Sequence, residues 1–403
     1  MDAYFAELGR VVLERWKAQN FSLEAFPAIA TEAMEELPPS ENVNRDELVR
    51  EFLVNDDQPP QTQSGFGQPE LVVYDHPRFY IQVLFWLDGT TQIHQHEFSG
   101  AFHVMEGSSI HSLYGFENAQ SITAHFRVGD LKLKLTELLE KGSTVPIVSG
   151  RDYLHSLFHL DMPSLTVVVR THEDPGTGPQ FTYLPPHIAV DPFFSDALTM
   201  RRTHLLDVME KLDDPAYPEI VAEMVEELDY ERGFFVLQNG VEYLMNLGAW
   251  DDVWSVFENK HGDLARYVPP TLEGILWRDR LVGFRGTITD AEQRFFLALL
   301  LTIPDREDIL EVVRKSFAGE PVDTIMRWAE ELSEASEMGT SILDAEFPEG
   351  TGIAEEAQAE SFFGALRCFL GGEDPVEKLK ISKEDADALR EALEESSLRA
   401  LVA

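Results

Sequence analysis

Two histidines separated by one residue are the strongest candidates for chemistry in this sequence. His94 and His96 lie in DGTTQIHQHEFSGAFHVMEG, and His155 follows a turn in GSTVPIVSGRDYLHSLFH. Because side chains two residues apart in a strand point to the same side, the first two imidazoles are expected to face inward together. Two histidines from one strand and a third from a distant strand predict a facial three-nitrogen metal site with open positions opposite.

The remaining histidines of this region allow several interpretations. His159 lies four residues after His155, so both side chains are expected on one face of the same strand. It is a candidate fourth ligand, proton shuttle or partner that holds a ligand in its tautomer. His103, His111 and His125 occur singly in strand-like segments, and we interpret them as ordinary core or surface residues.

These histidines lie in a region with the texture of a β-barrel or sandwich. Short β-branched and aromatic runs such as LVVY, FYIQVLFW, AFHVM and SLTVVVR alternate with turn residues. We predict that residues 70–175 form a small metal-binding barrel. A connector rich in Pro and Gly, HEDPGTGPQFTYLPPHIAVDP, follows it.

Helical segments are expected on both sides of the barrel. Residues 1–58 predict N-terminal helices that pack on it, with one helix at about 22–36 and another at about 45–54. A linker follows at 56–70. Residues 195–403 predict a separate helical domain without a fixed repeat. The expected fold class is therefore α+β.

Two patterns mark individual helices of the carboxyl-terminal half. Leu205, Val208 and Leu212 recur at helical spacing, which predicts one helix. Thr289 and Glu292 have the spacing of a capping box before the apolar run FFLALLL, which predicts the start of a core helix.

The histidine segments resemble the two motifs of the cupin superfamily. Gly89, His94, His96 and Gly107 fit the first motif, but Gly100 stands where most cupins have a glutamate ligand. Pro146, Gly150 and His155 fit the second motif, and His159 stands at its final Asn position. The resemblance implies a cupin barrel that binds metal through these histidines.

Within the cupins, the first 175 residues resemble the cysteine-dioxygenase-like family, which uses three histidines and no carboxylate. That family has cysteine or glycine at the position of Gly100. The resemblance implies a mononuclear Fe(II) centre, a small chelating thiol substrate and O₂ as the second substrate. Zn, Ni, Mn and Cu remain alternative metals, because histidine triads accept all of them.

Four residues depart from the pattern of that family. Glu70 lies nearest the position of the arginine that anchors the substrate carboxylate in the family. Thr166, Val168 and Arg170 occupy the positions of its Ser-His-Tyr relay. Arg170 is a candidate replacement for the missing anion anchor, so His159 and Arg170 are the candidate catalytic residues. A substrate other than cysteine is expected.

The composition excludes several classes of function. Among 403 residues, 72 are acidic and 32 basic, a net charge of −40 that disfavours direct binding to nucleic acid or anionic lipid. The single cysteine, Cys368, excludes an intrachain disulfide and a thiolate zinc site. No apolar run is long enough to span a membrane and the N-terminus lacks a signal-peptide core, so a cytoplasmic protein is expected.

Three functions fit these observations. The first is an Fe(II)-dependent oxygenase that acts on a small chelating molecule. The second is a non-enzymatic sensor whose barrel binds a metal or ligand and signals through the helical domain. The third is a cupin isomerase or hydrolase with another divalent metal. The helical domain is also a candidate site for a homodimer or a protein partner.

Overall fold

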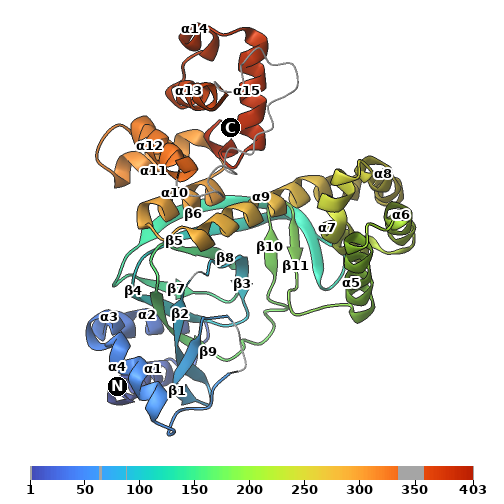
Figure 1. Ribbon diagram of the computed structural model, residues 1–403. Coiled ribbons are helices and arrows are strands. Elements are labelled where there is room, and N and C mark those ends of the chain that lie inside the picture. Colours follow the sequence, from blue (N-terminus) through green and yellow to red (C-terminus); the bar gives the residue numbers. More distant parts are fainter. Residues whose placement is uncertain (1, 63–65, 88, 335–357, 403) are drawn as a thin grey trace.

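The computed structural model describes residues 2–62, 66–87, 89–334 and 358–402. The chain begins with helices, continues as antiparallel strands and ends as helices (Figure 1). This arrangement confirms the α+β prediction. No helix within these ranges is both long and apolar enough to cross a membrane.

In the described residues before the first strand there are four helices: α1 (Asp2–Ala18), α2 (Phe26–Glu36), α3 (Pro39–Asn42) and α4 (Arg45–Val54). The helices predicted near 22–36 and 45–54 are α2 and α4. Asn44 caps α4, because its side chain accepts a hydrogen bond from the backbone N–H of Glu47.

Eleven strands form two sheets within the described ranges. They are β1 (Glu70–His76), β2 (Phe79–Trp86), β3 (Ile93–His96), β4 (Gly100–Glu106), β5 (Ser109–Ser121), β6 (Phe126–Leu139), β7 (Thr144–Ile147), β8 (Gly150–His159), β9 (Ser164–Thr171), β10 (Thr182–Leu184) and β11 (Ile188–Val190). One sheet has the order β1-β2-β9-β4-β7, and a closed barrel has the order β10-β11-β6-β5-β8-β3.

The strands extend past the predicted barrel boundary at residue 175. Strands β10 and β11 lie in the connector that the sequence pattern left outside the barrel, and they close it between β3 and β6. Each is three residues long and lies between prolines and glycines. Strands this short carry little periodicity of their own, so pairing partners decide whether they form.

In the five-stranded sheet, strand β2 packs one face against the N-terminal helices and lines an internal cavity with the other. Phe79, Ile81, Val83 and Phe85 belong to the core shared with the N-terminal helices. The residues between them, Tyr80, Gln82, Leu84 and Trp86, line an internal cavity. The period of two therefore gives this strand one face for α1 and α2 and one face for the site.

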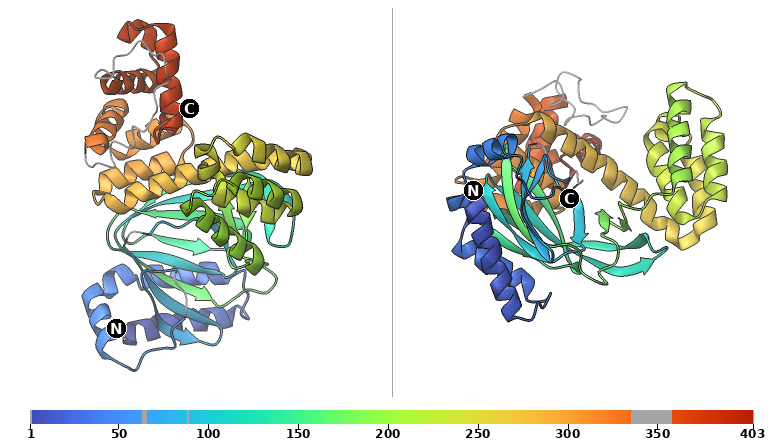
Figure 2. Two further views of the ribbon diagram at one scale, coloured as in Figure 1. Left: turned by 45° about the vertical axis from the view of Figure 1, so that its right-hand side comes forward. Right: turned by 90° about the horizontal axis from the view of Figure 1, so that it is seen from below.

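The carboxyl-terminal half is helical. Its elements are α5 (Ala197–Lys211), α6 (Tyr217–Glu227), α7 (Tyr230–Asn246), α8 (Trp250–His261), η1 (Gly262–Tyr267), α9 (Val268–Thr287), α10 (Ala291–Thr302), α11 (Arg306–Ser316), α12 (Pro321–Glu334), α13 (Gln358–Gly371), α14 (Pro375–Leu379), α15 (Lys383–Glu395) and η4 (Arg399–Leu401). Helices α9 and α10 lie on the opposite side of the strands from the N-terminal helices (Figures 1 and 2).

The helical half shares its cores with the strands. Ile110, Phe158 and Leu160 of the barrel region pack into one core with residues of α9 to α15. Phe126 and Ile188 join a second core with residues of α5 to α9. The strands that carry the site are therefore held by helices on both sides.

One local prediction for this half needs correction, and the contacts of another predicted helix are unexpected. The N-cap of α10 is Asp290 rather than Thr289, because the Asp290 side chain accepts from the backbone N–H of Gln293. The stripe of Leu205, Val208 and Leu212 does not face a core, since these side chains are 63%, 50% and 72% exposed. Helical spacing predicts a helix but does not establish what its apolar face contacts.

Candidate metal centre

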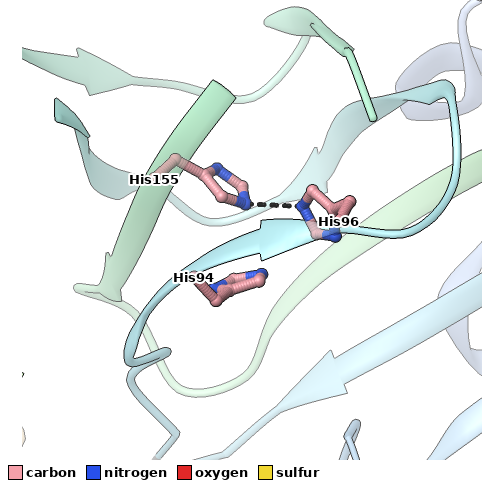
Figure 3. Close-up of side chains that lie close together, drawn as sticks. All are labelled: His94, His96 and His155. Carbon is pink, nitrogen blue, oxygen red and sulfur yellow. Dashed lines mark hydrogen bonds between the residues drawn. The ribbon is translucent and has the colours of Figure 1, made fainter. Parts of the chain in front are cut away.

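The three predicted ligands meet inside the strand region. His94 and His96 belong to β3, and His94 is directly opposite His155 of the neighbouring strand β8. The pairing shifts between His94 and His96, so His96 is opposite Gly150. Figure 3 shows the three imidazoles gathered in one place, and all three are buried.

The geometry of the cluster suits a metal ion. One ring nitrogen from each histidine can be chosen so that all three lie within 4.8 Å of one another. The Nε2 atoms of His96 and His155 are 2.9 Å apart. Two bonds of about 2.1 Å that meet at about 90° on a metal would separate two nitrogens by about 3.0 Å. This spacing matches a facial arrangement.

Unused ring nitrogens support the same interpretation. His94 Nδ1 is 2.8 Å from the backbone carbonyl of Gln92, which therefore receives its proton and leaves Nε2 as a lone-pair donor. His94 Nε2 is buried and has no hydrogen-bond partner in the described part of the chain. A buried polar atom without a partner is costly unless something binds it. A metal ion among the three imidazoles would use this atom.

The three imidazoles are neutral, which is the form that binds metal. Burial lowers the pKa of His94 to about 4. Burial and the neighbouring histidines hold the pKa values of His96 and His155 well below the ordinary value. Protons therefore compete little with a metal at neutral pH.

No carboxylate joins the cluster within the described ranges. Gly100 stands where the first cupin motif has a glutamate, and this partly explains why the cluster has no carboxylate within those ranges. A Cβ at residue 100 would lie 2.1 Å from the carbonyl oxygen of Val169 on the paired strand β9. Because this neighbour is backbone, no ordinary side chain fits at residue 100 without movement of the strands.

The metal centre opens into a cavity of about 320 Å³ between the two sheets. Its wall is mainly apolar and includes Leu84, Trp86, Phe98, Phe102, Ile147, Leu157 and Val168. Polar side chains other than the histidines line it at Thr62, Glu70, Tyr80, Gln82, Thr91, Glu97, Thr166, Arg170 and Gln180. We call this space the metal cavity. An apolar pocket with few polar groups is typical of small-molecule sites.

Arg170 is the positive group of the metal cavity. Its guanidinium stacks on Phe98 at 3.4 Å and lies 5.1 Å from the ring centre of Tyr80. It donates to the backbone carbonyls of Thr171 and His172. No carboxylate is within ion-pair distance of it among the described residues. Burial lowers its pKa, which means that the charge is partly desolvated.

His159 is fully buried, but it is not among the residues that line the metal cavity. Its ring stacks on Trp86 at 4.5 Å, and its Nδ1 is 2.8 Å from Ser109 Oγ. Burial lowers its pKa to about 3, so the ring is neutral near pH 7. A role for His159 in catalysis stays a prediction.

Sequence reasoning missed His111. The sequence suggested a core or surface histidine, yet His111 Nε2 lies 3.1 Å from His155 Nδ1. The strands paired with its own strand place His111 beside His155. A single histidine in a strand gives no sign in the sequence of such a contact. His103 and His125, in contrast, contact residues away from the triad: His103 bonds Ser40 and Thr144, and His125 bonds Asp191.

Comparisons with known proteins give structural neighbours but no family. No protein-family model matches the sequence, and no curated protein matches it. Among solved structures, a cupin-2 domain protein from Shewanella frigidimarina has 14% identity and a TM-score of 0.20; the match covers 33% of this chain and 97% of that one. Hydroquinone 1,2-dioxygenase from Sphingomonas sp. TTNP3 has 12% identity and a TM-score of 0.20, with coverage of 25% and 64%.

A recombinant oxalate oxidase has 18% identity and a TM-score of 0.19, with coverage of 34% and 66%. At these identities and scores the likeness carries no argument about activity. The function must therefore be argued from the residues of the site.

Proposed function

We propose that this protein is a mononuclear non-heme metal oxidoreductase, with Fe(II) held by His94, His96 and His155. The observation that carries the proposal is the cluster of three buried, neutral imidazoles with no carboxylate among the described residues. Three neutral ligands leave a divalent ion with its full positive charge. Such a site favours an anionic chelating substrate and leaves room for O₂.

The substrate that we propose is a small thiol or related chelating molecule that also carries a carboxylate. When bound, the metal supplies the activation of O₂, and both oxygen atoms enter the substrate, so no separate reductant is needed. Arg170 is proposed to bind the substrate carboxylate, because its partly desolvated charge faces the metal cavity without an ion-pair partner among the described residues. The stacked rings of Phe98 and Tyr80 fix the plane of its guanidinium.

The apolar wall of the metal cavity has two effects on this chemistry. It keeps the reacting groups away from bulk water, which strengthens the attraction between Arg170 and an anion. It also limits the substrate to a small molecule, because the cavity volume is about 320 Å³. These properties suit a reaction in the interior of the protein. We propose that the protein acts in the cytoplasm.

A sensor is the second candidate, and two contacts favour it. Arg285 of α9 donates to the backbone carbonyl of His159, and Arg294 of α10 donates to that of Leu160. Strand β8, which carries His155, is thereby tied to the helical half. In this alternative, metal or ligand binding would act on a protein partner through helices such as α5, whose apolar stripe is exposed.

Anaerobic loading with Fe(II) tests the proposal. The protein is expected to retain iron in proportion to chain, and O₂ uptake is expected with some members of a panel of thiol carboxylates. His94→Ala should abolish both, and His125→Ala serves as a matched control outside the triad. Metal binding without O₂ uptake from any thiol would favour the sensor, and failure to bind any divalent metal would contradict both functions.

A further inference from the structure

Behind His155, two side chains continue the hydrogen bonding away from the metal cavity. His155 Nδ1 is 3.1 Å from His111 Nε2, and His111 Nδ1 is 2.9 Å from Glu137 Oε1. The His111 side chain is completely buried, whereas that of Glu137 is 41% exposed. The three groups form a line from the metal centre to the surface of the barrel.

Strand register explains why these residues meet. His111 of β5 is directly opposite Glu137 of β6. On its other side β5 pairs with β8, where Leu113 is opposite His155. His111 and Leu113 are two residues apart and share a face, so His111 is the diagonal neighbour of His155.

From these contacts we propose that His111 and Glu137 position His155 as a metal ligand and increase the electron density on its Nε2. The proposal rests on the metal centre of the proposed function. When Nε2 of His155 binds the metal, its Nδ1 must carry the proton and donate it to Nε2 of His111. His111 must then be protonated on Nδ1, and the Glu137 carboxylate accepts that bond. Each ring nitrogen then has one role: it binds the metal, donates a hydrogen bond or accepts one. We call this chain of hydrogen bonds, which runs from His155 through His111 to Glu137, the relay.

The relay distinguishes His155 from the other two ligands. His94 is oriented by a backbone carbonyl, that of Gln92. His96 Nδ1 is buried with no partner in the described part of the chain. Within the described part of the chain, His155 is the only one of the three that is linked to a carboxylate, so Glu137 supplies at a distance the negative charge that the ligand set lacks. Tyr153 OH lies 3.5 Å from His155 Nδ1 and 3.3 Å from His111 Nε2, distances longer than the direct contact.

A cobalt titration tests this role without depending on turnover. His111→Leu removes the acceptor and is expected to weaken Co(II) affinity by about 10–100-fold, measured against a competing chelator. It should also alter the visible absorption of bound Co(II), because the orientation of His155 changes. His111→Gln, whose amide oxygen can accept from His155, is expected to restore part of both. Glu137→Gln keeps an acceptor but loses the charge, so a smaller weakening is expected.

His103→Leu is the matched control. His103 is as buried as His111 and also forms two side-chain hydrogen bonds, with Ser40 and Thr144. This variant should bind Co(II) with unchanged affinity and spectrum. Glu137 is partly exposed, so its variant decides the question even if His111→Leu fails to fold.

The outcomes separate the two proposals. Wild-type affinity and spectrum in both His111→Leu and Glu137→Gln would overturn the relay while leaving the metal centre intact. A spectrum that changes as much in His103→Leu as in His111→Leu would also overturn it, because general loosening of the barrel would explain both. Failure of the wild-type protein itself to bind Co(II) would instead contradict the proposed function.

Discussion

The metal cavity can be compared with a second hollow that histidine lines among the described residues, and the two differ in what surrounds the imidazoles. In the metal cavity, three buried histidines face one another, and no carboxylate of the described residues joins their cluster. A larger hollow of about 680 Å³ between the β5–β6 hairpin, α5 and α7 contains His125. We call this second space the helix-side hollow.

His125 has different contacts from the triad. Its Nδ1 is bonded to Asp191 at 2.8 Å, its ring stacks on Phe194 at 3.8 Å, and its side chain is 34% exposed. Asp229 and Glu231 also line the helix-side hollow. Size and histidine content therefore do not identify a metal centre. A metal centre is identified instead by neutral imidazoles whose unused lone pairs lie at the spacing of metal ligands.

The largest expected difference concerns metal affinity. His96→Ala removes a ligand from the metal cavity, and its loss should weaken Zn(II) or Co(II) binding by more than the about 10–100-fold expected for a supporting residue. His125→Ala removes the histidine of the helix-side hollow and should leave affinity unchanged. Equilibrium titration with a competing chelator measures both. If both variants lost the same metal affinity, the two hollows would not differ in metal binding.

The next difference concerns the two arginines. Arg170 in the metal cavity has no ion-pair partner among the described residues, whereas Arg232 in the helix-side hollow pairs with Asp229. Arg170→Met should weaken binding of mercaptoacetate to the Co(II)-loaded protein by about 10–100-fold, the equivalent of one charge-assisted hydrogen bond. Arg232→Met should not.

The thiolate-to-cobalt absorption band reports this binding. Mercaptoethanol, which lacks the carboxylate, provides the control ligand, and its affinity should be the same in all three proteins. If Arg170→Met weakened both thiols equally, Arg170 would shape the metal cavity rather than bind the carboxylate.

A third prediction concerns the absence of a carboxylate at residue 100. Gly100→Ala should destabilise the protein by about 1–3 kcal/mol, because the new Cβ meets the Val169 carbonyl at 2.1 Å and the strands must separate. Gly286→Ala is the control, since a Cβ there meets nothing within 4 Å in helix α9. Urea unfolding of the metal-free variants measures both. If Gly100→Ala left the stability unchanged, the backbone would not exclude a glutamate at this position.

The sequence predicts the metal centre better than its surroundings. The spacing of His94 and His96 alone implies a shared strand face, and the resemblance to the second cupin motif indicates His155. His111 and Glu137 are 26 residues apart in sequence, and their contact depends on the register of two strand pairs. Register is set by packing over whole strands, so no local pattern reveals it.

The helices show the same limit. Helical spacing correctly predicts α2, α4 and α5, because it reflects the period of the helix itself. It cannot tell whether Leu205 of α5 faces a core or solvent, since that depends on which elements reach its face. Strands β10 and β11 are missed for a related reason: three residues are too few to show a period, and their partners β3 and β6 are distant in sequence.

The smallest predicted effect concerns His159, which stacks on Trp86 in the wall of the metal cavity, and it is a dependence of stability on pH. The folded protein holds His159 neutral, with a pKa of about 3 because of burial and the nearby Arg285. In the unfolded chain the pKa of a histidine is about 6.5. Between these values the unfolded chain binds a proton that the folded protein does not, so stability falls as pH falls from about 6.5 towards 3. Above about 6.5 this contribution is fully present, and one such histidine gives a slope of at most about 1.4 kcal/mol per pH unit. His159→Gln should therefore flatten the decline in urea midpoint of the metal-free protein between about pH 6.5 and 5. An unchanged decline would mean that the pKa of His159 in the folded protein lies close to its value in the unfolded chain, and it would favour the proton-shuttle role that the sequence left open.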